Sequence, residues 1–203
     1  MLRAFTRPLL ATMFLAAAVS PSLSASVAKT YSYFTIGGTS LEEIESELST
    51  RGPKVGSTGR RHPGATQMEF TSKLGYSDTG SRCQIKSASV TVKAKVILPR
   101  WGRRSTSDPD TRMVWDTLSA DIKRHEESHV VIAKNYAREL EDGLKALGRF
   151  KTCEEAAQAA KTFTGRTLAK HDAEQDRFDY VEGVNFERRL LRLLQYRQEQ
   201  AAN

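Results

Sequence analysis

The segment of the chain best suited to chemistry is residues 124–130, which contain the pattern His-Glu-x-x-His. On a helix, His125 and His129 lie one turn apart on the same face, so their imidazole rings can converge on one ion. Neutral imidazole suits Zn²⁺, and a site with three protein ligands leaves the fourth position for water. Glu126 would then act as the general base on that water. The spacing therefore predicts a hydrolytic Zn²⁺ site.

The phase of the surrounding helix supports this interpretation, because both histidines fall on its apolar stripe. A histidine that faces a core needs a partner, since an unsatisfied buried polar group costs about 1–3 kcal/mol. A metal ion is one such partner, and a hydrogen bond to a neighbouring carboxylate is the alternative. The residues that mark the stripe are Leu118, Ile122, Tyr136, Leu140 and Leu144.

The third ligand is expected from residues 171–179, because no further histidine follows closely after His129. This later segment is dense in ligand-type side chains, and its candidates are Asp179, His171 and Glu174. Carboxylates there could instead orient an imidazole N–H without touching the metal. The choice among the three therefore stays open.

The elements that position these residues indicate an α+β fold. We expect a small antiparallel sheet in the N-terminal half, packed on the long zinc-motif helix and on a second, C-terminal helix. Alternating apolar residues predict strands at 68–76 and 90–98, and residues 31–36 supply a third strand. If the 90–98 strand lies at a sheet edge, it could bind a peptide substrate. The expected helices cover residues 39–52, residues 111–143, and residues 154–179 with a break or bend near Gly165.

The N-terminus has the features of a secretory signal peptide: two arginines, a short apolar stretch and then small residues. We expect a signal peptide at 1–28 with cleavage between residues 24 and 28, one zincin-like domain at 29–182, and a charged amphipathic helical tail at 183–203. An uncleaved anchor is the alternative. No later segment is apolar enough to span a membrane, so we expect no stable membrane span after cleavage and a secreted or periplasmic protein.

Export to an oxidising compartment makes a disulfide between the two cysteines the expected arrangement. In an oxidising compartment, Cys83 and Cys153 are expected to form a disulfide, because no Cys-x-x-Cys pattern indicates redox chemistry or zinc binding. Closing a loop of roughly 70 residues contributes about 4 kcal/mol in the chain-entropy description. The net charge of +7 is spread over scattered basic residues that do not alternate with aromatic ones. This pattern argues against a nucleic-acid partner.

The order of these landmarks resembles that of Domain of Unknown Function family 922, described as predicted secreted zinc-dependent proteases of bacteria. The resemblance extends from about residue 31 to 179 and implies a zinc protease with a peptide or protein substrate. The shared landmarks are the opening helix around Leu41, Gly52-Pro53, Cys83, the alternating strand, Pro99-x-Trp101, Trp115, His125-Glu126-x-x-His129, Cys153 and Phe178-Asp179.

The chain departs from the family pattern near its end. That pattern has Tyr-Asp followed shortly by His-Gly, whereas here Phe178 replaces the tyrosine and Val184-Asn185 replaces His-Gly. If the distal histidine is a family ligand, another residue of 171–179 must take its place.

We therefore expect an exported zinc metallopeptidase with Glu126 as general base, and Tyr136 or Tyr180 as candidates to stabilise the oxyanion. The alternative is a non-catalytic envelope protein that binds a metal or a partner. A zinc hydrolase acting on cell-wall amide bonds is a third hypothesis.

Overall fold

The computed structural model describes residues 25–55 and 59–202 and has one main sheet of four strands. The strands are β1 (Ser26–Ile36), β4 (Ala65–Asp78), β5 (Cys83–Trp101) and the short β6 (Arg149–Phe150). The order is β1-β5-β4, and β6 pairs with the start of β5. The α+β class predicted from the sequence is confirmed. The sheet is mixed, however, because β1 runs parallel to β5 while β4 and β6 run antiparallel to it.

The central strand β5 explains how the sheet forms its core. Its even-numbered residues from Ala88 to Leu98 are all buried, whereas the residues between them are more exposed. This alternation places one face of the strand against the helices and leaves the other toward solvent. Because β1 and β4 pair with both sides of β5, this strand is not an edge. The hypothesis that residues 90–98 offer a free edge to a peptide is therefore wrong.

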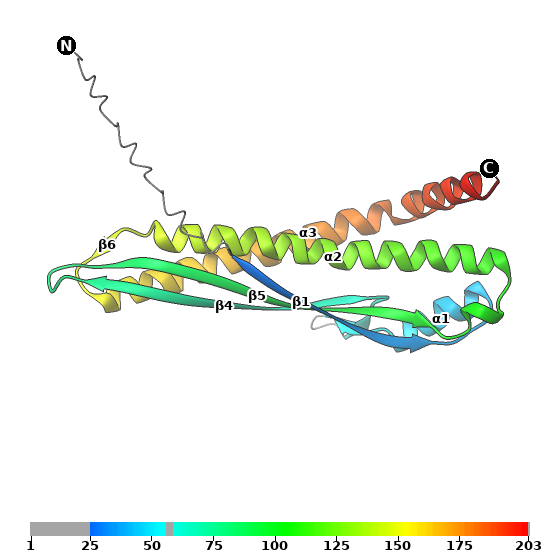
Figure 1. Cartoon of the computed structure of the whole chain (residues 1–203), viewed down its shortest axis with the longest axis horizontal. Coiled ribbons are helices and arrows are strands. Elements are labelled where there is room, and N and C mark those ends of the chain that lie inside the picture. The colour runs from blue at the N-terminus through cyan, green and yellow to red at the C-terminus, as the bar shows by residue number, and fades with distance from the viewer. Residues whose placement is uncertain (1–24, 56–58, 203) are drawn as a thin grey trace, which may run out of the picture.

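Helix α2 (Pro109–Lys145) covers the inner face of the sheet along its whole length (Figure 1). Asp108 caps its N-terminus by accepting a hydrogen bond from the Thr111 backbone N–H, and Pro109 follows in the first turn. Ala133, Ala137, Leu140 and Leu144 of α2 are fully buried in a cluster with residues of β5. Ile122 and Val130 join a second cluster with Ala94, Val96 and Leu98. The helix therefore presents a continuous apolar stripe to β5.

Helix α1 (Leu41–Arg51) and two short strands close one end of the molecule. Ser40 caps α1, and Ile44 and Leu48 pack with Trp101 and Trp115. Strands β2 (Lys54–Val55) and β3 (Arg60–Arg61) pair with each other, and a short 3-10 helix, η1 (Arg104–Thr106), precedes α2. A Cβ atom at Gly52 would lie 2.0 Å from the backbone oxygen of His62. Glycine at this position therefore lets the segment after β3 pass close to α1.

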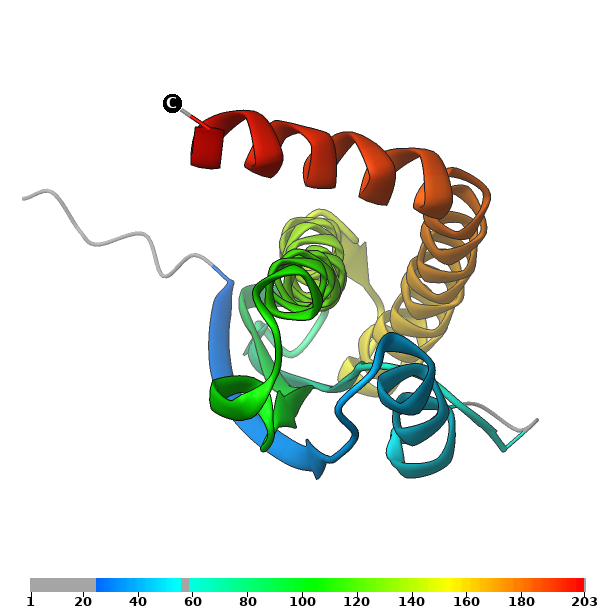
Figure 2. The same cartoon turned by 90° about the vertical axis from the view of Figure 1, so that its right-hand side faces the viewer.

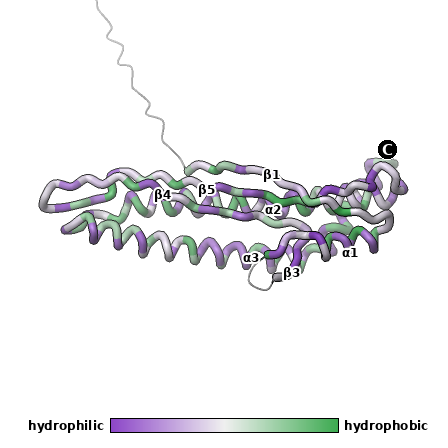
Figure 3. The backbone as a smooth tube through the Cα atoms, turned by 90° about the horizontal axis from the view of Figure 1, so that it is seen from below, coloured by the Kyte–Doolittle hydropathy of each residue, from purple (hydrophilic) through white to green (hydrophobic). Residues whose placement is uncertain are grey.

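Helix α3 (Cys153–Ala202) is continuous through Gly165, where the sequence suggested a break or bend, and through the boundary expected at 182/183. It runs beside α2 and then changes direction, so that its last turns cross over α2 (orange to red in Figure 2). Hydrophilic residues recur along α3 as far as its C-terminal end (purple in Figure 3). Its close approach to α2 depends on Gly143, because a Cβ there would lie 2.0 Å from the Phe163 ring.

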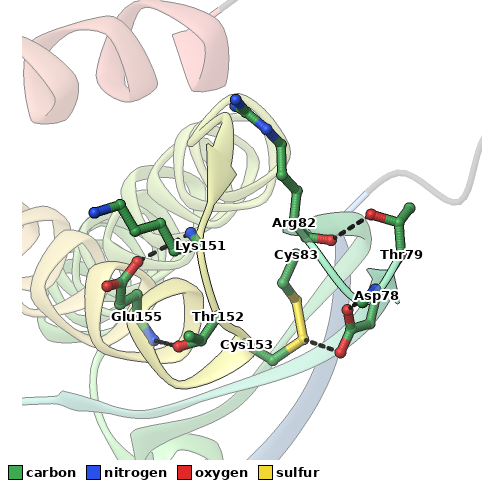
Figure 4. Close-up of a disulfide and its surroundings, with 9 residues drawn as sticks. Asp78, Thr79, Arg82, Cys83, Lys151, Thr152, Cys153 and Glu155 are labelled. Carbon is green, nitrogen blue, oxygen red and sulfur yellow. Dashed lines mark hydrogen bonds between the residues drawn. A yellow bond between two sulfur atoms is a disulfide. The ribbon is translucent and has the colours of Figure 1, made fainter.

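A disulfide joins Cys83 at the start of β5 to Cys153 at the start of α3 (Figure 4). The bond suggests an oxidising, extracytoplasmic environment. Within the described part of the chain, no helix combines the length and the apolar character needed to cross a membrane. The signal peptide expected at the N-terminus falls on residues 1–24, which lie outside the described residues, and on the first residues of β1.

Candidate metal centre

Two helices bring together three side chains that can hold a metal ion: His125 and His129 from α2 and Asp179 from α3. The His125 and His129 Nε2 atoms lie 3.1 Å apart, and Asp179 Oδ1 lies 3.2 Å and 3.0 Å from them, respectively. A tetrahedral ion with ligands at about 2.0–2.1 Å requires donor atoms about 3.3 Å apart. The donor triangle therefore has a size that can hold a small divalent metal ion.

Of the three candidates for the third ligand, only Asp179 lies in this cluster among the described residues. Glu174 forms an ion pair with Arg177 instead, with 2.5 Å between Glu174 Oε1 and Arg177 Nη2. His171 is buried one turn before Gln175, and its Nδ1 atom lies 2.9 Å from Asp172 Oδ1. Asp179, by contrast, keeps about half of its side chain exposed (52%), so the metal position is open to solvent.

Both imidazole rings turn their Nε2 atoms to Asp179 and their Nδ1 atoms to other acceptors. His129 Nδ1 lies 2.6 Å from Gln175 Oε1, and His125 Nδ1 lies 3.7 Å from Glu182 Oε2. The Phe178 ring stacks on His125 and meets His129 edge-on, with centroids about 5 Å away in both cases. Acceptors behind a ligating histidine fix its orientation and increase its basicity. The two rings are therefore oriented for ligation through Nε2.

Glu182 is itself held by charges. Arg124 of α2 donates a hydrogen bond to its carboxylate, and Arg189 Nη2 of α3 lies 3.3 Å from it. Both arginines also bind Asp121, which is almost fully buried. This network of two cations and two anions fastens the bent part of α3 to α2 beside His125.

Electrostatics in the site favour a negative Asp179 and a proton or cation beside it. Burial raises the pKa of Asp179, but its hydrogen bonds with His125 and His129 outweigh burial and hold the pKa well below its ordinary value. Burial lowers the pKa of His129, yet its interactions with Asp179 and Gln175 raise the pKa above its ordinary value. The triangle therefore attracts positive charge strongly.

Glu126 is buried, with 5% of the residue exposed, and lies on the wall of the same pocket. Its Oε2 atom accepts a hydrogen bond of 2.8 Å from the Thr66 hydroxyl of β4. Thr66 pairs with Val96 in the sheet and so faces α2. At Gly64, an added Cβ would lie 2.8 Å from Glu126 Oε1, so a side chain there would displace the carboxylate. Burial raises the pKa of Glu126, opposed by Thr66 and the two histidines.

A pocket of about 280 Å³ opens in front of these groups. His62, which follows strand β3, lines this pocket. Tyr136 and Tyr180, the candidates for oxyanion stabilisation, do not line it; Tyr136 meets the His171 ring and Tyr180 is 73% exposed. The lining residues are His62, Pro63, Asp121, Ile122, His125, Glu126, Asp179, Glu182, Gly183, Phe186 and Arg189.

Several residues that support the site were not found from the sequence: Gly64, Thr66, Gln175, Glu182 and Arg189. For two of them a signal exists in the sequence, because Gln175 and Glu182 lie four residues before and three after Asp179, on the same helical face. Gly64 and Thr66 carry no such signal, because their role depends on how β4 is placed against α2.

Comparison with known proteins identifies the family of the chain. Neither the curated proteins nor the solved structures include a significant relative of the chain. A family model, described as bacterial protein of unknown function (DUF922), matches residues 31–186, which contain all three potential metal ligands and Glu126. The chain therefore belongs to the DUF922 family of bacterial proteins of unknown function.

Proposed function

We propose that this protein is an exported zinc-dependent peptidase. One observation carries the proposal: the donor atoms of His125, His129 and Asp179 converge, and His125 and Asp179 line the same pocket as the buried Glu126. Two imidazoles and one carboxylate form a three-ligand zinc set that leaves a coordination position for water. Structural zinc sites, by comparison, are usually closed by four protein ligands.

In this proposal the protein holds the zinc ion through His125 Nε2, His129 Nε2 and Asp179. When bound, the ion lowers the pKa of a water molecule to about 7 and polarises a substrate carbonyl. Phe178 covers one side of both imidazoles and limits their movement. The charged network around Glu182 keeps α3, and with it Asp179, against α2.

Glu126 takes the proton of the attacking water on its carboxylate and passes it to the leaving amine. A general base works best when its pKa lies near the working pH, and burial raises the pKa of Glu126 in that direction. The Thr66 hydroxyl holds one carboxylate oxygen and so limits how far the side chain can rotate. The substrate is a peptide or protein, bound in the pocket in front of these groups.

The proposed place of action is outside the cytoplasm, either in the periplasm or secreted. The disulfide between the sheet and α3 supports this, because such bonds persist in oxidising compartments. Zinc ligation by imidazole also favours near-neutral pH, where the histidines lose their protons.

The experiment measures zinc content and peptide hydrolysis for the disulfide-bonded protein and matched variants. His125→Ala and Asp179→Ala should each lose zinc, whereas Glu126→Gln should keep zinc and lose hydrolysis of a quenched-fluorescence peptide library. Glu174→Ala is the control, because this carboxylate is on the same helix but lies outside the cluster. Its zinc content and rate should match those of the wild type.

The outcomes separate the hypotheses. A wild-type protein that carries no zinc and cannot be reconstituted with it would refute the metal site. Stoichiometric zinc without hydrolysis of peptides or of cell-wall amide bonds would instead identify a non-catalytic metal-binding envelope protein. If the protein hydrolyses cell-wall fragments but no peptide of the library, the proposed substrate class is wrong and the proposed zinc-dependent hydrolysis stands.

A further inference from the structure

We propose that Gln175 is a positioning residue that fixes the tautomer of His129 and so leaves the Nε2 lone pair free for the metal. This inference rests on the metal site of the proposed function and adds a residue to it. The side chain of Gln175 is buried beneath His129, between α2 and β4, and does not line the open pocket.

The contacts of the Gln175 amide determine which of its ends faces His129. Its Nε2 atom lies 3.2 Å from the backbone oxygen of His129, an atom that can only accept a hydrogen bond. The amide nitrogen must therefore stand at that position, and the amide oxygen must face the imidazole. That oxygen, Oε1, lies 2.6 Å from His129 Nδ1.

An amide oxygen can only accept, so His129 Nδ1 must carry a hydrogen. A neutral imidazole has one N–H, and the other nitrogen of His129 is then the unprotonated Nε2. This atom faces His125 Nε2 and Asp179 Oδ1 at 3.1 Å and 3.0 Å. In this neutral tautomer His129 can act as a ligand. In the metal-free protein the Asp179 carboxylate also attracts a hydrogen to Nε2, and Gln175 opposes this by holding the hydrogen on Nδ1.

The far end of the amide is anchored by His171. The Gln175 Nε2 atom lies 2.8 Å from His171 Nε2, and His171 Nδ1 lies 2.9 Å from Asp172 Oδ1. A carboxylate accepts, so His171 Nδ1 carries the hydrogen and His171 Nε2 accepts from the amide. In this series of hydrogen bonds each residue donates to the next: His129 to Gln175, Gln175 to His171, and His171 to Asp172.

Packing against β4 holds the side chains of Gln175 and His171 in place. The Gln175 amide nitrogen also lies 3.8 Å from the Met68 sulfur, and the His171 ring meets the Phe70 ring edge-on at 5.0 Å. Met68 and Phe70 share the inward face of β4 with Thr66, which holds Glu126. One strand face therefore supports the proposed base and the positioning residue. His171, which the sequence offered as a ligand, serves in this proposal as the anchor of Gln175.

The test reads the tautomer directly in the metal-free protein. Imidazole ¹⁵N–¹H correlation spectra distinguish an Nδ1–H from an Nε2–H ring, and the chain has only four histidines to assign. At a pH at which the ¹⁵N shifts show His129 to be neutral, the Nδ1–H form should predominate in the wild type. In Gln175→Met, which has a similar volume but no amide, the Nε2–H form should become a major species. Zn²⁺ affinity should fall by about 10–100-fold.

Two further variants separate positioning from simple packing. Gln158→Met makes the same replacement at an exposed position of the same helix and should change neither the spectrum nor the affinity. Gln175→Glu keeps an acceptor oxygen for His129 Nδ1, but it removes the amide donor to His171 and to the His129 backbone oxygen and adds a negative charge. It should keep the Nδ1–H tautomer and bind Zn²⁺ more tightly than Gln175→Met.

An unchanged His129 tautomer in Gln175→Met would overturn the proposal. Equal losses of affinity in Gln175→Met and Gln175→Glu, with wild-type tautomers in both, would overturn it as well, since only packing would then be affected. If Gln175→Met fails to fold, Gln175→Glu tests the proposal in its place. The proposal then requires that Gln175→Glu keeps the Nδ1–H tautomer of His129 and still binds Zn²⁺. A wild type that binds no Zn²⁺ refutes the proposed function, but the tautomer measurement still tests the role of Gln175.

Discussion

Thr66→Val should move the acid limb of the pH–rate profile to higher pH, because it removes the hydroxyl that donates to Glu126. The hydroxyl oxygen lies 2.8 Å from Glu126 Oε2 and 3.0 Å from the Glu126 backbone oxygen. Valine has nearly the same shape, so the main loss is the hydrogen bond. Since that bond stabilises the charged carboxylate and burial opposes the charge, its removal raises the pKa of Glu126 further.

The size of the shift follows from the bond that is lost. A hydrogen bond to a charged group contributes about 1.5–3 kcal/mol. One pKa unit corresponds to about 1.36 kcal/mol, which gives a rise of about 1–2 units. Because the single hydroxyl hydrogen is shared between two acceptors, the lower end, about 1 unit, is expected.

The assay is kcat/KM for a fluorogenic peptide between pH about 4 and 9, with zinc content measured at each pH. Thr66→Ser keeps the hydroxyl and is the control, so its acid limb should stay at the wild-type pH. The plateau of Thr66→Val should remain within a few-fold of wild type, because the base is still present. An acid limb that does not move, moves to lower pH, or moves equally in both variants would refute this account of how Glu126 is held.

Three further predictions concern stability. The pKa of His129 in the folded protein lies above its ordinary value of 6.5. Protonated His129 therefore stabilises the folded state fully below pH 6.5, and this contribution is lost as the pH rises through the folded pKa. The melting temperature of the metal-free protein should fall as the pH rises above 6.5, and saturating Zn²⁺ should reverse this trend. Gly143→Ala should lower the unfolding free energy measured in urea by about 1–3 kcal/mol, because the new methyl group meets the Phe163 ring. Gly165→Ala, whose Cβ would have no neighbour within 4 Å, should leave the unfolding free energy unchanged or raise it. Equal effects of the two substitutions would contradict the packing of α3 on α2 at Gly143. Cys153→Ser should lower the unfolding free energy by about 4 kcal/mol, and reduction of the wild type should have the same effect.

Much of the fold could be predicted from the sequence, because its signals are local. The alternation around residues 90–98 marks β5, and the long apolar stripe marks α2. Strand order could not be predicted, because which strands flank β5 depends on contacts between distant segments. Gly165 predicts a break or bend in the C-terminal helix because glycine lowers helix propensity. No heavy atom of a neighbouring element lies within 4 Å of the position that a Cβ would occupy there, and the helix continues through Gly165.

For the candidate site, the sequence could predict what one helix contains. His125, Glu126 and His129 follow from spacing within α2, and residues 171–179 supply the helix that faces them. The sequence could not show that Asp179, rather than His171 or Glu174, is the third potential ligand. That choice depends on how α3 is rotated about its own axis, which is set by its packing against α2 and β4. Only the spacing of four residues from Asp179 points to Gln175, because glutamine is a common helix residue whose side chain does not by itself indicate a metal site.

Five of the residues that α3 contributes to the site and its support follow alternating steps of four and three: Gln175, Asp179, Glu182, Phe186 and Arg189. Such steps keep side chains on one stripe of a helix. One residue inserted or deleted upstream within α3 would turn this stripe by about 100°, away from α2. A substitution would remove one contact, but a change of length would remove them all together. Natural relatives of this chain should therefore differ along α3 by substitution and keep its length between the disulfide and the metal site constant.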